Sequence, residues 1–256
     1  MCLAVVALGA HPRYALVIAA NRDEFHARAA APAAWGQAPP FMDIVAGRDL
    51  AAGGTWFGVH RTGRWALVTN VREGGNSDAA ARSRGELVPL VLGASSLDDA
   101  FAALGAAAPR YNGFNLLAGD ATRALWMSNR ADGMRRLHAG LHGLSNALID
   151  TPWPKLLRTR DRMAAWAATG NRDIAPLFAT LADTTPAPDH LLPSTGVPRE
   201  RERMLSSAFI LSDTYGTRCS TIFTIDHDGE ARLHERSFDP AGATMGEAIE
   251  SFALAQ

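Results

Sequence analysis

Cysteine is scarce in this chain, which has two such residues, Cys2 and Cys219, among 256. A small secreted domain held together by disulfides needs more pairs than this, so that class of protein is excluded. The first residues have no basic segment, and the apolar start is soon interrupted by the turn residues 11–13, so we expect no signal peptide. We therefore expect a cytoplasmic protein in which both cysteines are free thiols.

The chain also lacks a long hydrophobic run and an excess of charge of one sign. Its apolar stretches fall well short of the ~20 residues that span a bilayer, so we expect no stable membrane insertion. The 25 basic and 26 acidic residues give a formal net charge of -1, so we expect no nucleic-acid partner. The eight histidines show no metal-binding spacing, and no glycine-rich phosphate loop is present, so we expect no metal site and no nucleotide fold of the Rossmann type.

The order of the predicted elements favours one domain over residues 1–256. Strand hairpins come first, helices occupy the middle, and strands return near the end, an order typical of an α+β fold with two antiparallel sheets covered by helices. Residues 29–40, rich in Ala and Pro, are predicted as a loop, and the polar residues 183–203 as a mobile loop. Residues 208–213 are predicted as a strand.

The start of the chain predicts a hairpin that brings a polar run close to Cys2. Residues 2–8 and 14–20 are apolar strand candidates separated by turn residues, and Asn-Arg-Asp-Glu follows at residues 21–24. In an antiparallel hairpin the end of the second strand lies beside the start of the first. We therefore expect the polar run near Cys2 in space.

Cys2 has two interpretations. Removal of Met1 would place a free α-amine beside the thiol, which combines a nucleophile and a general base in one residue. A carboxylate of the polar run would then hold the amine, Arg22 would favour the thiolate, and Asn21 would orient a substrate or stabilise an oxyanion. The alternative is that Cys2 is a small apolar residue at the start of a buried strand.

Three further polar residues stand at predicted strand ends. Asn70 and Asn146 each follow a short apolar strand, and Arg218 precedes a late one. Each residue alone is typical of a turn or of the surface. Together with the polar run they indicate a common region where several strands end.

Taken in order, these segments resemble the NRDE family, the family of transport and Golgi organisation protein two. The resemblance rests on Met-Cys at the start, Asn-Arg-Asp-Glu at residues 21–24, Gly-Gly-Thr-Trp-Phe-Gly at 53–58, Thr-Asn-Val-Arg at 69–72, Asn-Gly-Phe-Asn at 112–115, Gly-Leu-Ser-Asn at 143–146 and Tyr-Gly-Thr-Arg at 215–218. The family is similar to the N-terminal nucleophile hydrolases and, within them, to the choloylglycine hydrolase, penicillin V acylase and acid ceramidase group. This resemblance implies a four-layer αββα sandwich.

The resemblance also implies catalytic roles. Cys2 would be the nucleophile, its α-amine the base, and Asp23 the carboxylate that holds the amine. The remaining implied catalytic residues are Asn21, Asn70, Arg218 and, in the oxyanion hole, Asn146. In those hydrolases the arginine precedes the asparagine of the motif. Because Arg22 follows Asn21 here, we expect it on the opposite face of the strand unless the backbone bulges.

Two functions remain open at this point. The first is an acyl hydrolase that cleaves an amide or a thioester with Cys2. The second is a non-catalytic carrier of haem or of acyl-CoA and lipid, since family members are associated with both. We expect no cofactor, and haem would be a ligand. The substrate-binding candidates for either function are Arg22, Glu24, Trp56 and Arg72.

Overall fold

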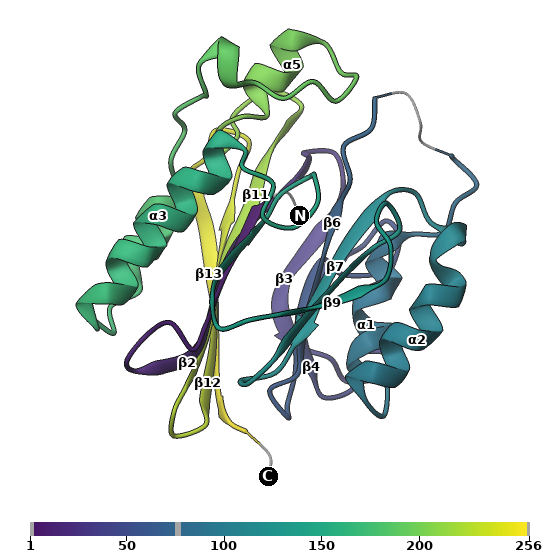
Figure 1. The fold of residues 1–256 in the computed structure, drawn as a ribbon, viewed down its shortest axis with the longest axis vertical. Coiled ribbons are helices and arrows are strands. Elements are labelled where there is room, and N and C mark those ends of the chain that lie inside the picture. Colours follow the sequence, from purple (N-terminus) through teal and green to yellow (C-terminus); the bar gives the residue numbers. More distant parts are fainter. Residues whose placement is uncertain (1–2, 75–77, 255–256) are drawn as a thin grey trace.

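Two antiparallel sheets face each other in the computed structural model, which describes residues 3–74 and 78–254, and helices cover their outer faces (Figure 1). Sheet A runs in the order β10 (Gly140–Leu144), β1 (Leu3–Leu8), β2 (Tyr14–Phe25), β11 (Tyr215–Asp226), β12 (Glu230–Phe238) and β13 (Thr244–Ala253). Sheet B runs in the order β3 (Ala30–Trp35), β4 (Ile44–Asp49), β5 (Phe57–His60), β6 (Trp65–Asn70), β7 (Phe114–Gly119), β8 (Ala124–Ser128) and β9 (Met134–Leu137).

The helices divide between the two sheets. Helices α1 (Leu87–Leu92) and α2 (Leu97–Ala107) lie on sheet B, whereas α3 (Pro154–Thr169) and α4 (Ala175–Leu181) lie on sheet A. Helix α5 (Arg199–Met204) lies beyond the end of the sheets, at the top of Figure 1. Three 3-10 turns, η1 (Arg84–Glu86), η2 (Ala108–Arg110) and η3 (Asp189–Leu191), complete the elements of the described residues. The layers are those of an αββα sandwich, as predicted.

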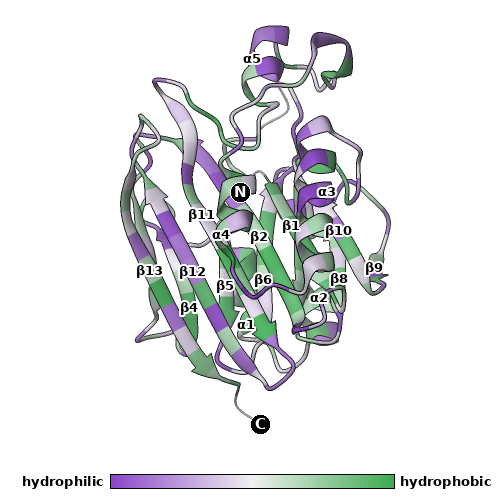
Figure 2. Cartoon of the chain, turned by 90° about the vertical axis from the view of Figure 1, so that its left-hand side faces the viewer, coloured by the Kyte–Doolittle hydropathy of each residue, from purple (hydrophilic) through white to green (hydrophobic). Residues whose placement is uncertain are grey.

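Strand alternation separates two cores on either side of sheet A. Val6, Ile18 and Phe223 point between the sheets, whereas Val5 and Val17 point toward α3 and α4. All five residues are fully buried. Figure 2 shows the hydrophobic colour concentrated on β1 and β2 at the centre of the sheet, with more hydrophilic segments on β12 and β13. The central strands are therefore apolar on both faces, so a polar side chain there needs a hydrogen-bonding partner within the protein.

Local sequence signals set the helix ends. Ser96 caps α2 by accepting a hydrogen bond from the backbone N–H of Asp99 (3.1 Å). Pro154 opens α3, where its missing N–H costs nothing, and Gly170 ends it with φ 65°. These signals set where both helices begin and where α3 ends.

Three local predictions are wrong. Residues 29–40 include the edge strand β3, where a bulge lies between Ala31 and Ala34 and Pro32 is exposed, so its missing N–H breaks no ladder. Residues 208–213 form no strand, and β13 closes sheet A instead. The stretch 183–203 is not one loop, because it contains η3 and most of α5, whose Glu202 is buried and ion-paired with Arg72.

Candidate functional site

The Asn-Arg-Asp-Glu run lies inside β2, with a neighbouring strand on each side. Leu3 of β1 pairs with Asn21, and β11 places Cys219 beside Arg22 and Thr217 beside Asp23. The predicted hairpin is thus confirmed as far as Leu3. Cys2, which the sequence nominates as nucleophile, lies outside the described residues. Its covalent neighbour Leu3 is fully buried.

Asn21 points to the helix side of sheet A and is fully buried. Its Nδ2 donates to the carbonyl oxygens of Leu181 (2.9 Å) and Ala208 (2.8 Å), and its Oδ1 accepts a hydrogen bond from Ser220 Oγ (2.6 Å). Both amide hydrogens are therefore used. In this structure Asn21 fastens β2 to the end of α4 and to the segment before β11, which leaves no donor for a substrate oxyanion.

Asp23 is buried on the same strand, and its carboxylate is hydrogen-bonded within the protein. Its Oδ1 accepts a hydrogen bond from Thr217 Oγ1 (2.7 Å), which in turn accepts one from the N–H of Ile210 (2.9 Å). The N–H of Thr217 also donates to the carbonyl of Ile210 (2.9 Å). Because the hydroxyl is fixed from both sides, Thr217 sets the orientation of the Asp23 carboxylate. Sequence reasoning missed this role, although Thr217 belongs to the Tyr-Gly-Thr-Arg motif.

Arg22 points between the sheets, away from the face that Asn21 occupies. Its guanidinium lies 4.2 Å from the ring centroid of Trp56, and 4% of the residue is exposed. The pairing of β2 with β1 is regular, so the predicted orientation of Arg22 is confirmed. The bulge lies on the other neighbour, β11, between Thr217 and Cys219.

Arg218 is the residue that this bulge leaves without a partner in the ladder. Its Nη1 donates to three carbonyl oxygens of the turn after β2, those of Phe25 (3.1 Å), His26 (3.0 Å) and Arg28 (3.2 Å). The contacts of this predicted catalytic arginine are therefore with the backbone, and they close that turn.

Asn70 and Asn146, far apart in the sequence, come together. Asn146 Nδ2 donates to the carbonyl oxygen of Asn70 (3.0 Å), and the carbonyl of Asn146 accepts from the N–H of Arg72 (2.7 Å). Asn146 is 6% exposed, whereas Asn70 is exposed. This pair joins the end of β6 in sheet B to the segment after β10 in sheet A.

The segment that carries Asn146 is held by buried polar groups of sheet B. Thr69 Oγ1 donates to the carbonyl of Ser145 (2.8 Å), and Asn115 Nδ2 donates to the carbonyl of Ala147 (2.9 Å). The indole of Trp126 donates to Asn115 Oδ1 (3.3 Å) and fixes its amide. Asn115, the last residue of the Asn-Gly-Phe-Asn motif, thus positions the loop, a role that its place in the motif did not reveal.

Arg72 and Glu24 differ in how far they are engaged. Arg72 forms a buried ion pair with Glu202 (2.5 Å) and lies over the ring of Trp153, 4.7 Å from its centroid. In this structure Arg72 therefore anchors the segment before β11, and its charge is already paired. Glu24 accepts from the N–H of Phe25 (2.9 Å) and lies 4.0 Å from Arg28 Nε, a distance at which a half-exposed pair contributes little.

A cavity of about 300 Å³ at this end of the sandwich is lined by four of the sequence-predicted residues. These are Arg22, Glu24, Trp56 and Asn70. Its other walls carry several arginines and aspartates, so its lining is mainly polar. This cavity is the candidate functional site.

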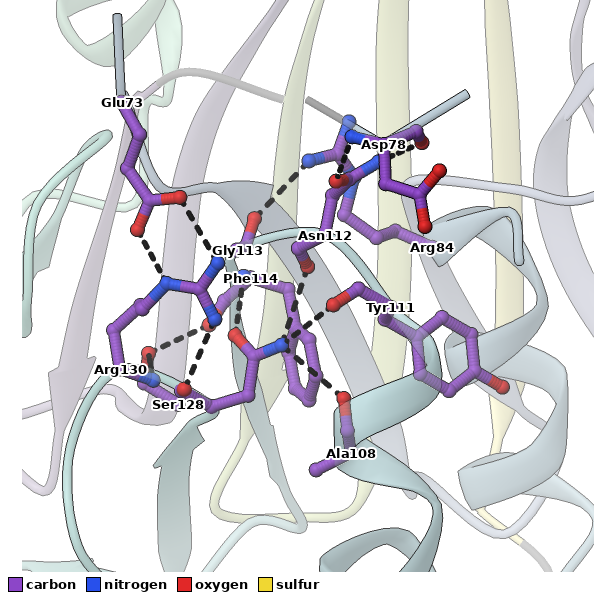
Figure 3. A network of polar contacts seen from close by, with 11 residues as sticks. Glu73, Asp78, Arg84, Ala108, Tyr111, Asn112, Gly113, Phe114, Ser128 and Arg130 are labelled. Atoms are coloured by element: carbon purple, nitrogen blue, oxygen red, sulfur yellow. Dashed lines mark hydrogen bonds and ion pairs between the residues drawn. The ribbon is translucent and has the colours of Figure 1, made fainter. Parts of the chain in front are cut away.

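Residues 78–85 contribute to one wall of the cavity, and polar contacts hold the chain on both sides of residues 75–77 (Figure 3). Before them, Glu73 forms a two-pronged ion pair with Arg130. After them, Asp78 and Asn112 exchange two hydrogen bonds of 2.8 Å, and Arg84 donates to the carbonyl of Gly113 (3.1 Å). A larger depression of about 950 Å³ shares Asp78, Ala81, Arg82 and Asn112 with the candidate site, but none of the sequence-predicted site residues lines it.

Two buried acids lie deeper between the sheets. Burial raises the pKa of the Cys219 thiol well above its usual value, and burial also raises the pKa of Glu235. Within residues 3–74 and 78–254, no group of three His, Cys, Asp or Glu side chains is placed to hold a metal ion. No helix in the same part of the chain is long and apolar enough to cross a membrane.

The two-sheet sandwich is the fold of the N-terminal nucleophile hydrolases. It is similar to the N-acylethanolamine-hydrolyzing acid amidase ortholog of Caenorhabditis elegans, with TM-score 0.53 and 13% identity over 82% of this chain and 100% of that one. It is also similar to the C2A mutant of conjugated bile acid hydrolase from Clostridium perfringens, with TM-score 0.50 and 8% identity over 99% and 92% of the two chains.

The chain belongs to the Transport and Golgi organisation 2 family, whose model matches residues 1–240. The bovine transport and Golgi organization protein 2 homolog is 35% identical over 246 residues, which cover 88% of this chain and 87% of the relative. The human homolog is 34% identical over 251 residues with the same coverage. The family predicted from the motifs is thereby confirmed.

Proposed function

We propose that this protein is an acyl hydrolase that cleaves amides or thioesters with the thiol of Cys2 after removal of Met1. The observation that carries the proposal is the position of Asp23. It is buried on β2, two residues beyond the pairing partner of Leu3, and Thr217 fixes its carboxylate. A carboxylate held at the beginning of β1 is what an N-terminal amine needs in order to be oriented as a base.

The proposed reaction has two steps. In the first, the α-amine takes the proton of the thiol, the sulfur attacks the acyl carbonyl carbon, and the amine returns the proton to the leaving nitrogen or sulfur. In the second, the amine takes a proton from water, the resulting hydroxide attacks the thioester, and the carboxylic acid is released as the Cys2 thiol is restored. Asn146, whose Nδ2 donates to the carbonyl of the cavity-lining Asn70, is our candidate for donating a hydrogen bond to the oxyanion of each step.

Further support comes from the relatives, within limits. One structural neighbour is an amidase, and another is a hydrolase whose C2A mutant places a cysteine at its own position 2. At such low identity the similarity supports the fold alone, so the argument for the reaction rests on the residues of this chain.

The test is turnover of a panel of acyl amides and acyl thioesters by purified protein. We expect Cys2→Ala to abolish turnover and Cys2→Ser to reduce it strongly, because the hydroxyl is the weaker nucleophile. Cys219→Ala is the matched control. The Cys219 thiol is buried and its pKa is raised, so we expect this substitution to leave turnover unchanged. Wild-type protein that turns over nothing yet binds haem or acyl-CoA would favour the carrier function, and turnover that survives both Cys2 changes would refute the mechanism.

A further inference from the structure

A second cavity lies on the other side of Arg22 and has no part in the proposed reaction. It measures about 270 Å³ and lies between β3 of sheet B and strands β11 to β13 of sheet A. Arg22 and Trp56 line both this cavity and the candidate site, so their stack forms a shared wall. The rest of the lining includes Pro32, Phe238 and Met245. Met245 is 71% exposed, which places the mouth of the cavity at β13.

The inner end of this cavity holds a buried cation whose hydrogen bonds are incomplete. Arg22 Nη1 is buried and has no hydrogen-bond partner among the residues that the structure describes. The face of Trp56 is its visible partner, and a ring face attracts a cation without accepting a full hydrogen bond. A buried guanidinium is costly unless an acceptor or a counter-ion offsets its loss of water.

Two carboxyl groups, Glu247 and Glu235, share the cavity. Glu247 is hydrogen-bonded to His234 and Arg236. Glu235 lies within electrostatic reach of Arg22 but accepts its hydrogen bonds from other groups. Its Oε1 accepts from the N–H of Ala33 (2.8 Å), and its Oε2 accepts from Thr221 Oγ1 (3.2 Å). Both oxygens are thus engaged elsewhere. Burial raises the pKa of Glu235, whereas the nearby charge of Arg22 acts to lower it. The cavity therefore combines a mainly apolar lining with a guanidinium at its inner end whose Nη1 has no hydrogen-bond acceptor among the described residues.

We propose that this cavity binds an aliphatic monocarboxylate, with the carboxylate at Arg22 and the chain between β3 and the β12–β13 hairpin. The volume sets the size of the ligand. At roughly 30 Å³ for each water-sized group, the cavity holds about nine non-hydrogen atoms, which lies between hexanoate and octanoate. Such binding needs no turnover and so goes beyond the proposed function, although a carboxylic acid is also the product of acyl hydrolysis.

Calorimetric titration of Cys2→Ala protein with a series from acetate to decanoate tests the proposal, because the variant cannot turn over. We expect affinity to rise about fourfold for each buried methylene and to level off between hexanoate and octanoate. Octanol has the same chain without the charge and should bind at least tenfold more weakly, and octylamine should not bind. Equal affinity for octanoate and octanol, or no saturable octanoate binding at millimolar concentration, would overturn the proposal.

Two variants test separately the end of the cavity that would bind the carboxylate and the part that would bind the aliphatic chain. Arg22→Met should weaken octanoate binding tenfold or more, whereas Arg232→Met, at an exposed arginine of β12, should leave it unchanged. Gly246 lines the cavity, and a Cβ there would meet nothing within 4 Å, so Gly246→Leu should fill the space without disturbing the backbone. It should weaken octanoate and spare acetate. Octanoate binding that survives both changes would place the ligand elsewhere, whatever the turnover panel shows.

Discussion

The hydroxyl of Thr217 joins strand β11 to the carboxylate on which the proposed reaction depends. The stability of Thr217→Val therefore tests whether this hydroxyl holds Asp23 in place. Valine keeps the shape of threonine but removes the hydroxyl, which donates to Asp23 Oδ1 and accepts from the N–H of Ile210. Thr217 is 1% exposed, so water cannot replace these bonds without a rearrangement. Each buried group left without its partner costs about 1–3 kcal/mol, so the loss for Asp23 Oδ1 and the N–H of Ile210 together is about 2–6 kcal/mol in the free energy of unfolding.

Urea unfolding followed by circular dichroism measures this loss. Thr224→Val is the matched control, because Thr224 lies on the same strand, is 5% exposed, and has no side-chain hydrogen bond among those the structure describes. We expect the control to change the free energy of unfolding by less than about 1 kcal/mol. Turnover by Thr217→Val should fall even at urea-free, fully folded conditions, since the carboxylate loses its orientation. Equal stability of the two variants would refute the assignment of Thr217 as the group that holds Asp23.

Two further predictions concern a histidine of β10 and a glycine close to the ring of Trp56. The hydrogen bond between His142 Nδ1 and Asp150 Oδ2 (2.9 Å) raises the pKa of His142 above 6.5; burial alone would raise the pKa of Asp150, but its hydrogen bonds lower it below 3.8. The histidine's contribution is present below pH 6.5 and lost as pH rises through its raised pKa, while the aspartate's is present above pH 3.8 and lost at lower pH, so the pair stabilises most between these values. From pH 5.5 to 8, urea titrations should show wild type losing about 0.5–1 kcal/mol more than His142→Gln, and an equal loss would contradict the pairing. A Cβ on Gly47 would lie 2.3 Å from the Trp56 ring, so Gly47→Ala should lower the free energy of unfolding by about 1–3 kcal/mol, against little change for Gly246→Ala; equal effects would show that the ring moves freely.

The sequence predicts the two-sheet fold and part of the grouping of the polar residues, because strand pairing follows from local pattern. The apolar runs around a turn predict the β1–β2 hairpin, and alternation within it places Arg22 on the face opposite Asn21. Polar residues at strand ends predict the meeting of Asn70 and Asn146. These inferences need only the period of a strand and the antiparallel rule.

Partners that lie far apart in the sequence are what the pattern does not contain. The hydrogen bonds of Asn21 to Leu181 and Ala208 span 160 and 187 residues, so its structural role appears only in three dimensions. Nothing in the sequence near Arg72 predicts its ion pair with Glu202, because only the fold brings the two residues together. The edge strand β3 was missed for a different reason, since its Ala and Pro residues are typical of loops and only a bulge makes the proline tolerable.

The central claim is that Cys2, with a free α-amine, forms a covalent acyl intermediate. The most direct measurement is intact mass and peptide mapping of the protein after brief exposure to an acyl thioester, compared with the same protein kept behind an uncleaved N-terminal fusion. We expect the free protein to have lost Met1 and to gain one acyl group on Cys2, and the fused protein, which has no α-amine at Cys2, to gain none. Equal acylation of both forms, or acylation only at residues other than Cys2, would contradict the account.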